Sequence, residues 1–188
     1  KNTHYNYSSF PIPYIMNDEL YYEILCNSVD NEKDIEFHFN CFKSIKNSLY
    51  KNSNLLAIDF YSINDLIEFS NKETIIYESM SELVPKLILT KRQFKKHISC
   101  LIDYLFSTDS CNFCLIPDTS KLNNNLFYCW CKKNEFLLVN YKNNFLDFKF
   151  TTNTLLVNSV SLLLENTYLN TPDNFKSKEY IANFLKSL

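Results

Sequence analysis

Apolar residues recur every three or four positions in several segments between residues 17 and 106, a spacing typical of amphipathic helices. Asn17, followed by Asp18 and Glu19, is a good helix start because acidic side chains stabilise the positive end of the helix dipole. The clearest apolar stripe consists of Ile35, Phe39, Phe42, Ile45 and Leu49. The pattern predicts helices over residues 17–29, 31–51, 63–70, 72–84 and 91–106.

Two capping boxes support helix starts within this region. Ser62 with Asp65 and Thr90 with Gln93 have the spacing at which each side chain can satisfy the other residue's backbone N–H. Pro85 ends the helix predicted over 72–84. The short apolar run 54–61 fits either a buried strand or a buried helical turn, because periodicity cannot distinguish the two over eight residues.

After a loop at 107–125 the pattern changes from helical to alternating. Residues 126–132, 135–141 and 145–151 read as three short strands with tight connections, which favours an antiparallel meander. Two helices follow, over 154–168 and from the Thr171-Pro172 pair to about 187. The sequence thus predicts a predominantly helical α+β fold: a helical N-terminal part, a three-stranded meander at about 126–151, and two C-terminal helices. This order resembles, in topology alone, small interaction modules such as the RWD class.

Residues 1–16 are aromatic and polar, and Pro11 and Pro13 block a helix there. We therefore expect an extended aromatic arm at 1–16, followed by one α+β domain at 17–188. The loop at 107–125 is the candidate seam within that domain.

The chain contains no glycine, which excludes a Rossmann fingerprint, a P-loop, a kinase glycine-rich loop and a G-x-S-x-G elbow. Asparagine is the next-best residue for left-handed backbone, so Asn134 and the asparagines at 123–125 and 143–144 are predicted to form turns. Alanine occurs only at Ala57 and Ala182, and Arg92 is the sole arginine. This usage indicates an AT-rich genome, such as that of an intracellular parasite or a large DNA virus.

The formal net charge of −2 hides an asymmetry between the halves of the chain. Residues 1–85 carry six lysines and thirteen acidic residues, whereas residues 86–188 carry thirteen basic and eight acidic residues. Such halves could attract each other, face solvent or mark a partner surface. No run of 18 apolar residues occurs, so no membrane span is predicted.

Seven cysteines, an odd number, favour a reducing intracellular compartment, cytoplasm or nucleus, although a secreted protein whose leader was removed stays open. Four of them are close enough in sequence to be candidate zinc ligands: Cys111, Cys114, Cys129 and Cys131. A regular strand would separate Cys129 from Cys131 by about 6.6 Å along the chain, too far for sulfurs that share one zinc. Three interpretations of these four cysteines are compatible with the sequence: unligated residues, a redox pair or disulfide between Cys111 and Cys114, and a zinc site.

Two further groups could carry chemistry. His97 and Cys100 lie three residues apart on one predicted helix, as a cysteine nucleophile and its base would, but no oxyanion site accompanies them. Basic side chains cluster on the same helix at Lys91, Arg92, Lys95 and Lys96. That cluster could face solvent, bind an acidic protein partner or contact phosphates. Sequence-specific recognition of bases relies mainly on arginine, and the chain has only one.

The sequence therefore predicts a non-enzymatic protein–protein interaction domain, a subunit or adaptor of a larger assembly, with no catalytic residue and no cofactor. Aromatic residues are favoured at interfaces, and the first-choice contact patch is Tyr5, Tyr7, Phe10, Tyr14, Tyr21 and Tyr22. The first alternative is a zinc-stabilised nucleic-acid-associated protein that uses the four clustered cysteines and the 91–96 basic face. The second alternative is a cysteine-dependent enzyme with a glycine-free site.

Overall fold

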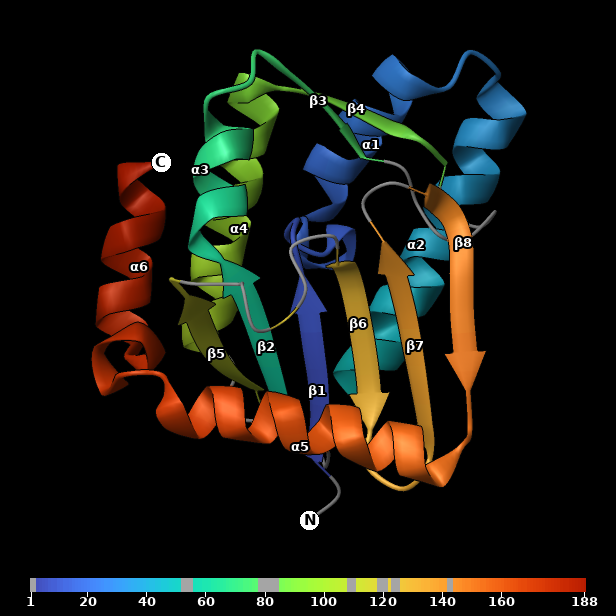
Figure 1. Cartoon of the computed structure of the whole chain (residues 1–188). Helices are drawn as coiled ribbons and strands as arrows, with labels where there is room; N and C mark the ends of the chain where they lie inside the picture. Colours follow the sequence, from blue (N-terminus) through green and yellow to red (C-terminus); the bar gives the residue numbers. More distant parts are fainter. Residues whose placement is uncertain are drawn as a thin grey trace.

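A computed structural model of the chain describes residues 3–51, 56–77, 85–107, 111–117, 122, 126–141 and 144–188. Its centre is a six-stranded mixed sheet with the strand order β5-β2-β1-β6-β7-β8 (Figure 1). The strands of this sheet are β1 (Thr3–Ser8), β2 (Leu56–Ser62), β5 (Cys111–Ile116), β6 (Leu126–Lys132), β7 (Phe136–Tyr141) and β8 (Asn144–Thr151). A separate hairpin pairs β3 (Thr74–Tyr77) with β4 (Leu87–Thr90).

Six α-helices surround the sheet within the described part of the chain. They are α1 (Asp18–Ser28), α2 (Glu32–Lys51), α3 (Ile63–Ser70), α4 (Lys91–Ser107), α5 (Thr154–Asn170) and α6 (Lys178–Ser187). Two short 3₁₀ turns, η1 (Pro13–Ile15) and η3 (Asp173–Lys176), lie before α1 and before α6. Figure 1 shows α5 crossing the front of the sheet, with α1 and α2 behind it.

The sheet has a parallel half and an antiparallel half that meet at β1. β1 pairs in parallel with β2, and β2 pairs in parallel with β5. On its other side β1 pairs antiparallel with β6, which continues as a meander through β7 and β8. The first strand of the described chain is therefore an interior strand with a ladder on each edge.

The two parallel connections place their helices on the same face. The path from β1 to β2 and then to β5 moves in one direction along the sheet, so crossovers of one handedness stack on one side. A core forms there between Tyr61, Phe113 and Leu115 of the sheet and apolar residues of α1, α4 and α6. The start of α4 is fixed by the predicted Thr90–Gln93 capping box: the Gln93 N–H donates to Thr90 Oγ1 at 3.2 Å, and the Thr90 N–H donates to Gln93 Oε1 at 2.9 Å.

The opposite face carries a second core beneath α5. It contains Tyr5, Tyr7, Ile58, Phe60, Cys114, Cys129, Cys131 and Leu137 from the strands, with Val157 and Leu164 from α5. Asn153 caps α5 by accepting hydrogen bonds from the N–H groups of Leu155 and Leu156. α5 packs against β6 and β7, so this helix covers that region of the sheet.

A pair of asparagines fastens α5 to the turn between β6 and β7. The Asn134 N–H donates to Asn158 Oδ1 at 3.1 Å, and Asn158 Nδ2 donates to Asn134 Oδ1 at 3.0 Å. Asn134 has φ of 63°, so the prediction that this asparagine forms a left-handed turn in place of glycine is confirmed. Residues 123–125 and Asn143 lie outside the described residues, and Asn144 is the first residue of β8.

The predicted fold class is wrong. Residues 126–151 do contain three antiparallel strands, but these strands are half of a six-stranded sheet and not a separate meander. The missed strands are β1, in the segment predicted to be an arm, β2, in the run left open, and β5, inside the predicted loop. β2 and β5 lack the regular alternation of apolar and polar residues that signals a strand, because parallel strands are covered on both faces. Because there is no separate meander, the topological resemblance to the RWD class does not hold.

Two predicted helices also need correction. Residues 74–77 form β3 and not the start of a helix, and Ile75 faces Leu89 of β4. The β-branched residues of the two short segments favour a strand pair over a single helical turn. Residues 78–84 of the predicted helix lie outside the described part. Thr171 does not begin the last helix but ends α5, and α6 begins at Lys178 with Ser177 as its cap. Between α5 and α6 lies the turn η3, which contacts β5, and α6 then packs on α4.

We expect Tyr7→Ala to lower the free energy of unfolding by about 3–5 kcal/mol, because it removes a fully buried aromatic ring from the central strand. Tyr22→Ala is the matched control, since Tyr22 is 47% exposed on α1, and we expect it to cost about 1 kcal/mol or less. Urea unfolding followed by circular dichroism measures both. Equal losses for the two variants would contradict the interior position of β1.

Candidate functional site

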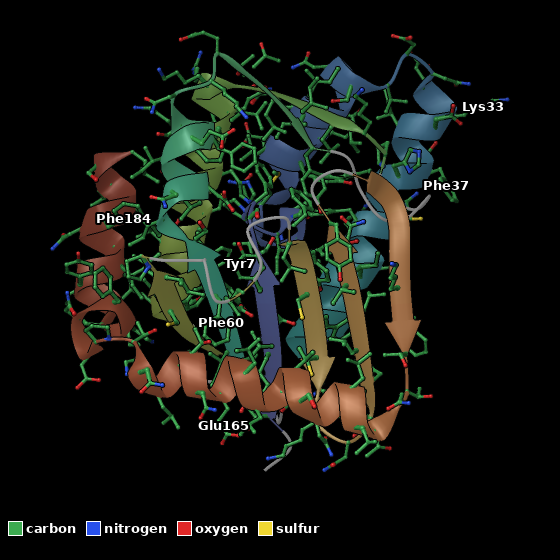
Figure 2. The ribbon with its side chains drawn as sticks, in the orientation of Figure 1. Tyr7, Lys33, Phe37, Phe60, Glu165 and Phe184 are labelled. Carbon is green, nitrogen blue, oxygen red and sulfur yellow. The ribbon has the colours of Figure 1, made fainter. Side chains whose placement is uncertain are left out.

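Most of the aromatic residues expected to form a contact patch lie in the interior. Tyr5, Tyr7, Phe10 and Tyr21 are buried, whereas Tyr14 is half-buried and Tyr22 is exposed. Figure 2 labels Tyr7 and Phe60, which face each other on the neighbouring strands β1 and β2. Burial raises the pKa of Tyr7 to about 12, and its hydroxyl donates to Asp65 Oδ2 over a long 3.5 Å. These rings stabilise the fold and leave little surface for a partner.

The four candidate zinc ligands do not come together. Cys114 pairs with Phe60, Phe60 with Tyr7, and Tyr7 with Cys129, so the two cysteines lie in one cross-strand row with two strands between them. Three strand spacings separate them by about 14 Å, far beyond the reach of a shared zinc ion. Cys111 begins β5 beside Cys114, but its side chain lies outside the described residues. Among the residues that are described, no group of three or more histidine, cysteine, aspartate or glutamate side chains is placed to bind a metal ion.

The buried thiols are also poor nucleophiles. Cys114, Cys129 and Cys131 are buried free cysteines in the core under α5. Burial raises the pKa of Cys114 and of Cys131 to about 11, and it raises that of Cys129 further. Only the thiolate attacks electrophiles or binds metals, so these three residues act as small apolar side chains.

His97 is a structural residue of the α1/α4 core. Its ring is fully buried beside Phe10, and Nε2 donates to the carbonyl oxygen of Ile12 at 3.2 Å. Nδ1 is buried without a hydrogen-bond partner. Burial lowers the pKa of His97 to about 4, because a charged ring would be desolvated and its second N–H would have no acceptor. Cys100, three residues further along α4, is only partly buried, and the predicted nucleophile–base pair has no support in this geometry.

The basic cluster on α4 is partly used inside the molecule. Lys96 Nζ lies 2.8 Å from Glu23 Oε2, and Lys91 Nζ lies 3.6 Å from Glu73 Oε1. The hydrogen bond from Lys96 is the main cause that lowers the pKa of Glu23. Arg92 and Lys95 are exposed. The basic second half of the chain therefore pairs in part with the acidic first half, which reduces the charge available to an outside partner.

The outward face of α5 is the most unusual surface of the described structure. One stripe of the helix is buried at Val157, Ser161 and Leu164. The opposite stripe, which we call the leucine stripe, consists of Leu155, Leu156, Ser159, Leu162, Leu163, Asn166, Leu169 and Asn170, all of them exposed. Its five leucines are exposed by 40 to 82%, and none of its members is charged. A single exposed leucine needs no explanation, but five on one helix face form a contiguous apolar patch typical of an interaction site.

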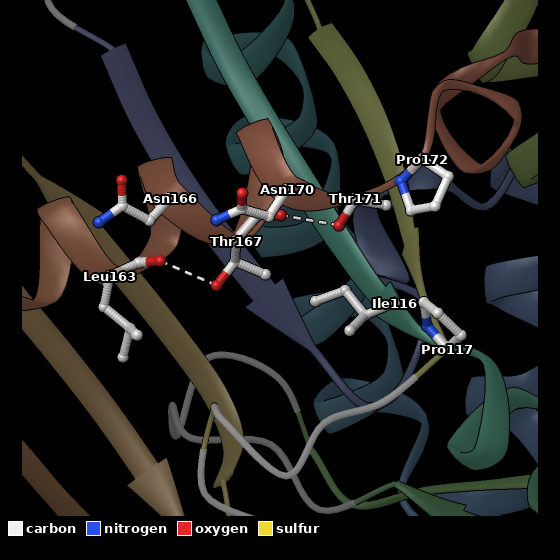
Figure 3. A pocket seen from close by; sticks show the side chains of 8 residues that line it. All are labelled: Ile116, Pro117, Leu163, Asn166, Thr167, Asn170, Thr171 and Pro172. Atoms are coloured by element: carbon white, nitrogen blue, oxygen red, sulfur yellow. Dashed lines mark hydrogen bonds between the residues drawn. The ribbon is translucent and has the colours of Figure 1, made fainter.

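A hollow of about 280 Å³ adjoins the C-terminal end of the stripe (Figure 3). Its lining residues come from the end of β5 and from the end of α5: Ile116, Pro117, Leu163, Asn166, Thr167, Asn170, Thr171 and Pro172. The hydroxyls of Thr167 and Thr171 donate to the carbonyls of Leu163 and Thr167, so they are engaged within the helix. The hollow is therefore suited to an apolar side chain more than to a charged ligand.

The sequence contains a signal for this surface. Residues 154–168 were predicted to form a helix, and a helix that packs on one sheet needs only one apolar stripe. Leu155, Leu162 and Leu169 recur every seven residues on the other side. These leucines form a second apolar stripe, which packing against the sheet does not explain.

Comparison with known proteins gives no guide to function: the chain matches no protein family, no curated protein and no solved structure. No helix in the described ranges is both long enough and apolar enough to cross a lipid bilayer.

We expect iodoacetamide at pH 8 to alkylate Cys26 while Cys129 and Cys131 stay unmodified in the folded protein. Cys26 is exposed, whereas a thiol with a pKa of about 11, such as that of Cys131, is only about 0.1% thiolate at pH 8 and is also shielded. Peptide mass spectrometry before and after unfolding in urea measures the labelling of each cysteine. Labelling of Cys129 at the rate of Cys26 would refute its burial.

We expect the free energy of unfolding to fall as pH drops from about 6.5 towards 4. Burial lowers the pKa of His97 from 6.5 to about 4, so in this window the unfolded chain binds more protons and stability is lost, by about 3 kcal/mol in full. Burial also lowers the pKa of His4, which acts in the same direction. Urea unfolding at several pH values should give a smaller slope for His97→Gln than for the wild type; an unchanged slope would contradict the assignment.

Proposed function

We propose that this chain is a non-enzymatic interaction subunit whose contact surface is the leucine stripe of α5. The observation that carries the proposal is the exposure of five leucines on a helix whose packing on the sheet is already satisfied by its other stripe. The aromatic patch that was the first choice from the sequence has less support for this role, because four of its six members are buried.

The free energy available at this surface is sufficient for association. The combined exposure of the five leucines equals about three fully exposed leucine side chains, and covering them would contribute about 5–9 kcal/mol before the costs of association. Interface cores are depleted in charge, and the stripe contains no charged residue. Ionic residues such as Glu165, which lies 3.8 Å from Lys133 of the β6–β7 turn, border the stripe as a polar rim.

The alternatives from the sequence have less support. A zinc-stabilised nucleic-acid-associated protein would need the four cysteines to converge, and the sheet separates Cys114 from Cys129 by about 14 Å. A cysteine-dependent enzyme would need a reactive thiolate, and the pKa values of the buried thiols are raised. The cysteines whose side chains the structure describes are free, which supports the reducing intracellular compartment that we include in the proposal: Cys26, Cys41, Cys100, Cys114, Cys129 and Cys131.

Site-specific photo-crosslinking tests this function. We expect a benzoylphenylalanine placed at Leu162 to form a protein adduct, because that side chain lies at the middle of the stripe. The matched control is the same label at Phe106, an exposed aromatic side chain near the end of α4 and outside the stripe, with an exposed fraction of 53% against 55% for Leu162. The adduct should be competed by unlabelled wild-type protein and not by a Leu155→Asp/Leu162→Asp variant. Equal adducts from both labels, or competition by the variant, would contradict the proposed surface.

A further inference from the structure

We propose that the leucine stripe binds a second copy of this chain, with the two α5 helices packed antiparallel around a two-fold axis. This inference rests on the proposed function and names its partner. In a two-fold interface the same surface meets itself, so it must be complementary to itself. A stripe without charged residues meets this condition, because no like charges are placed opposite each other.

One antiparallel register matches three of the four pairs of stripe members by type. When the two-fold axis passes between Leu162 and Leu163, Leu162 lies level with Leu163 of the second copy. In the same register Leu156 lies level with the second copy's Leu169, six residues or about 9 Å from the central pair at 1.5 Å per residue. Apolar side chains thus face apolar side chains along the middle of the pair.

Two of the three polar members of the stripe pair with each other in this register. Ser159 lies level with Asn166 of the second copy. The Ser159 hydroxyl donates to the Leu155 carbonyl at 2.7 Å, which leaves the lone pairs of its oxygen to accept from the Asn166 amide. A polar pair inside an apolar helix interface favours one register, because a shift by one helical turn in either direction would place the Asn166 amide level with a leucine.

The hollow beside α5 provides a place for the most exposed leucine. Leu155 is 82% exposed and in this register is level with Asn170 of the second copy, one of the residues that line the hollow. The wall formed by Ile116, Pro117 and Pro172 is apolar (Figure 3). Each copy therefore has a projecting Leu155 at one end of its stripe and the hollow at the other end. The two-fold axis places each Leu155 beside the hollow of the other copy.

The area fits a dimer of modest affinity. The five leucines leave on the order of 500 Å² exposed per copy, so pairing removes about 1,000 Å² from water before the polar members are counted, near the lower limit for specific interfaces. We therefore expect a dimer with a dissociation constant in the micromolar range, populated as protein concentration rises.

Sedimentation velocity of the full chain between about 1 and 100 µM tests the proposal. The wild type should shift from monomer to dimer over this range. Leu162→Asp should weaken the dimer at least tenfold, because each copy then places a carboxylate against apolar side chains. Phe106→Asp is the control, with a similar exposed fraction on a different helix, and should dimerise like the wild type. Circular dichroism and thermal melting of each variant check that the fold is retained.

A mixing experiment tests the register. Leu162→Asp and Leu163→Lys should each be monomeric alone and form a heterodimer when mixed, because the aspartate of one copy then lies level with the lysine of the other. Recovery of the dimer on mixing supports the antiparallel pair, whereas a wild-type dimer that neither variant weakens overturns it.

Two further outcomes separate this inference from the proposed function. A wild-type chain that stays monomeric at 100 µM, while the label at Leu162 still forms an adduct heavier or lighter than twice the chain, overturns the second copy and keeps the interaction surface. A monomer whose stripe binds phosphatidylcholine/phosphatidylserine vesicles in a Leu162-dependent manner, with no protein adduct, overturns both.

Discussion

The pairing of β1 on both edges is the constraint on which the rest of the structure depends. Tyr7 faces Phe60 on one side and Cys129 on the other, so a single residue joins the parallel half of the sheet to the antiparallel half. Its neighbours along the row, Cys114 on β5 and Val139 on β7, continue the same line across the sheet. The two cores, the crossover helices and the site of α5 all take their positions from this strand.

The sequence predicted what depends on local chemistry. Asn17, Ser62 and Thr90 were identified as caps, and each accepts the expected backbone hydrogen bond. Asn134 takes the left-handed conformation in a chain that has no glycine to offer. These features involve residues within a few positions of one another, so one short window of sequence contains the whole interaction.

What could not be predicted depends on partners distant in sequence. Nothing within residues 3–8 shows that they will lie between strands that begin at residues 56 and 126. β5 shows no regular alternation because its side chains from Phe113 to Ile116 are buried on both faces, so the segment was predicted to be part of a loop. The exposed stripe of α5 was missed for a different reason: the sequence predicted a helix there but did not show which of its apolar residues the sheet would cover, and the buried residues are Val157, Ser161 and Leu164.

The central position of β1 has a consequence for how the chain folds during synthesis. Tyr7 leaves the ribosome 122 residues before its partner Cys129, an interval of about 6–25 s at ordinary rates of translation. In the later part of that interval, once β2 has emerged, the nascent β1–β2 pair has a free backbone edge on a strand with large aromatic side chains, the kind of edge that pairs with foreign strands. A chain of this topology has a long window of vulnerability to misassembly, and chaperones that shield strand edges would act most strongly on it before β6 emerges.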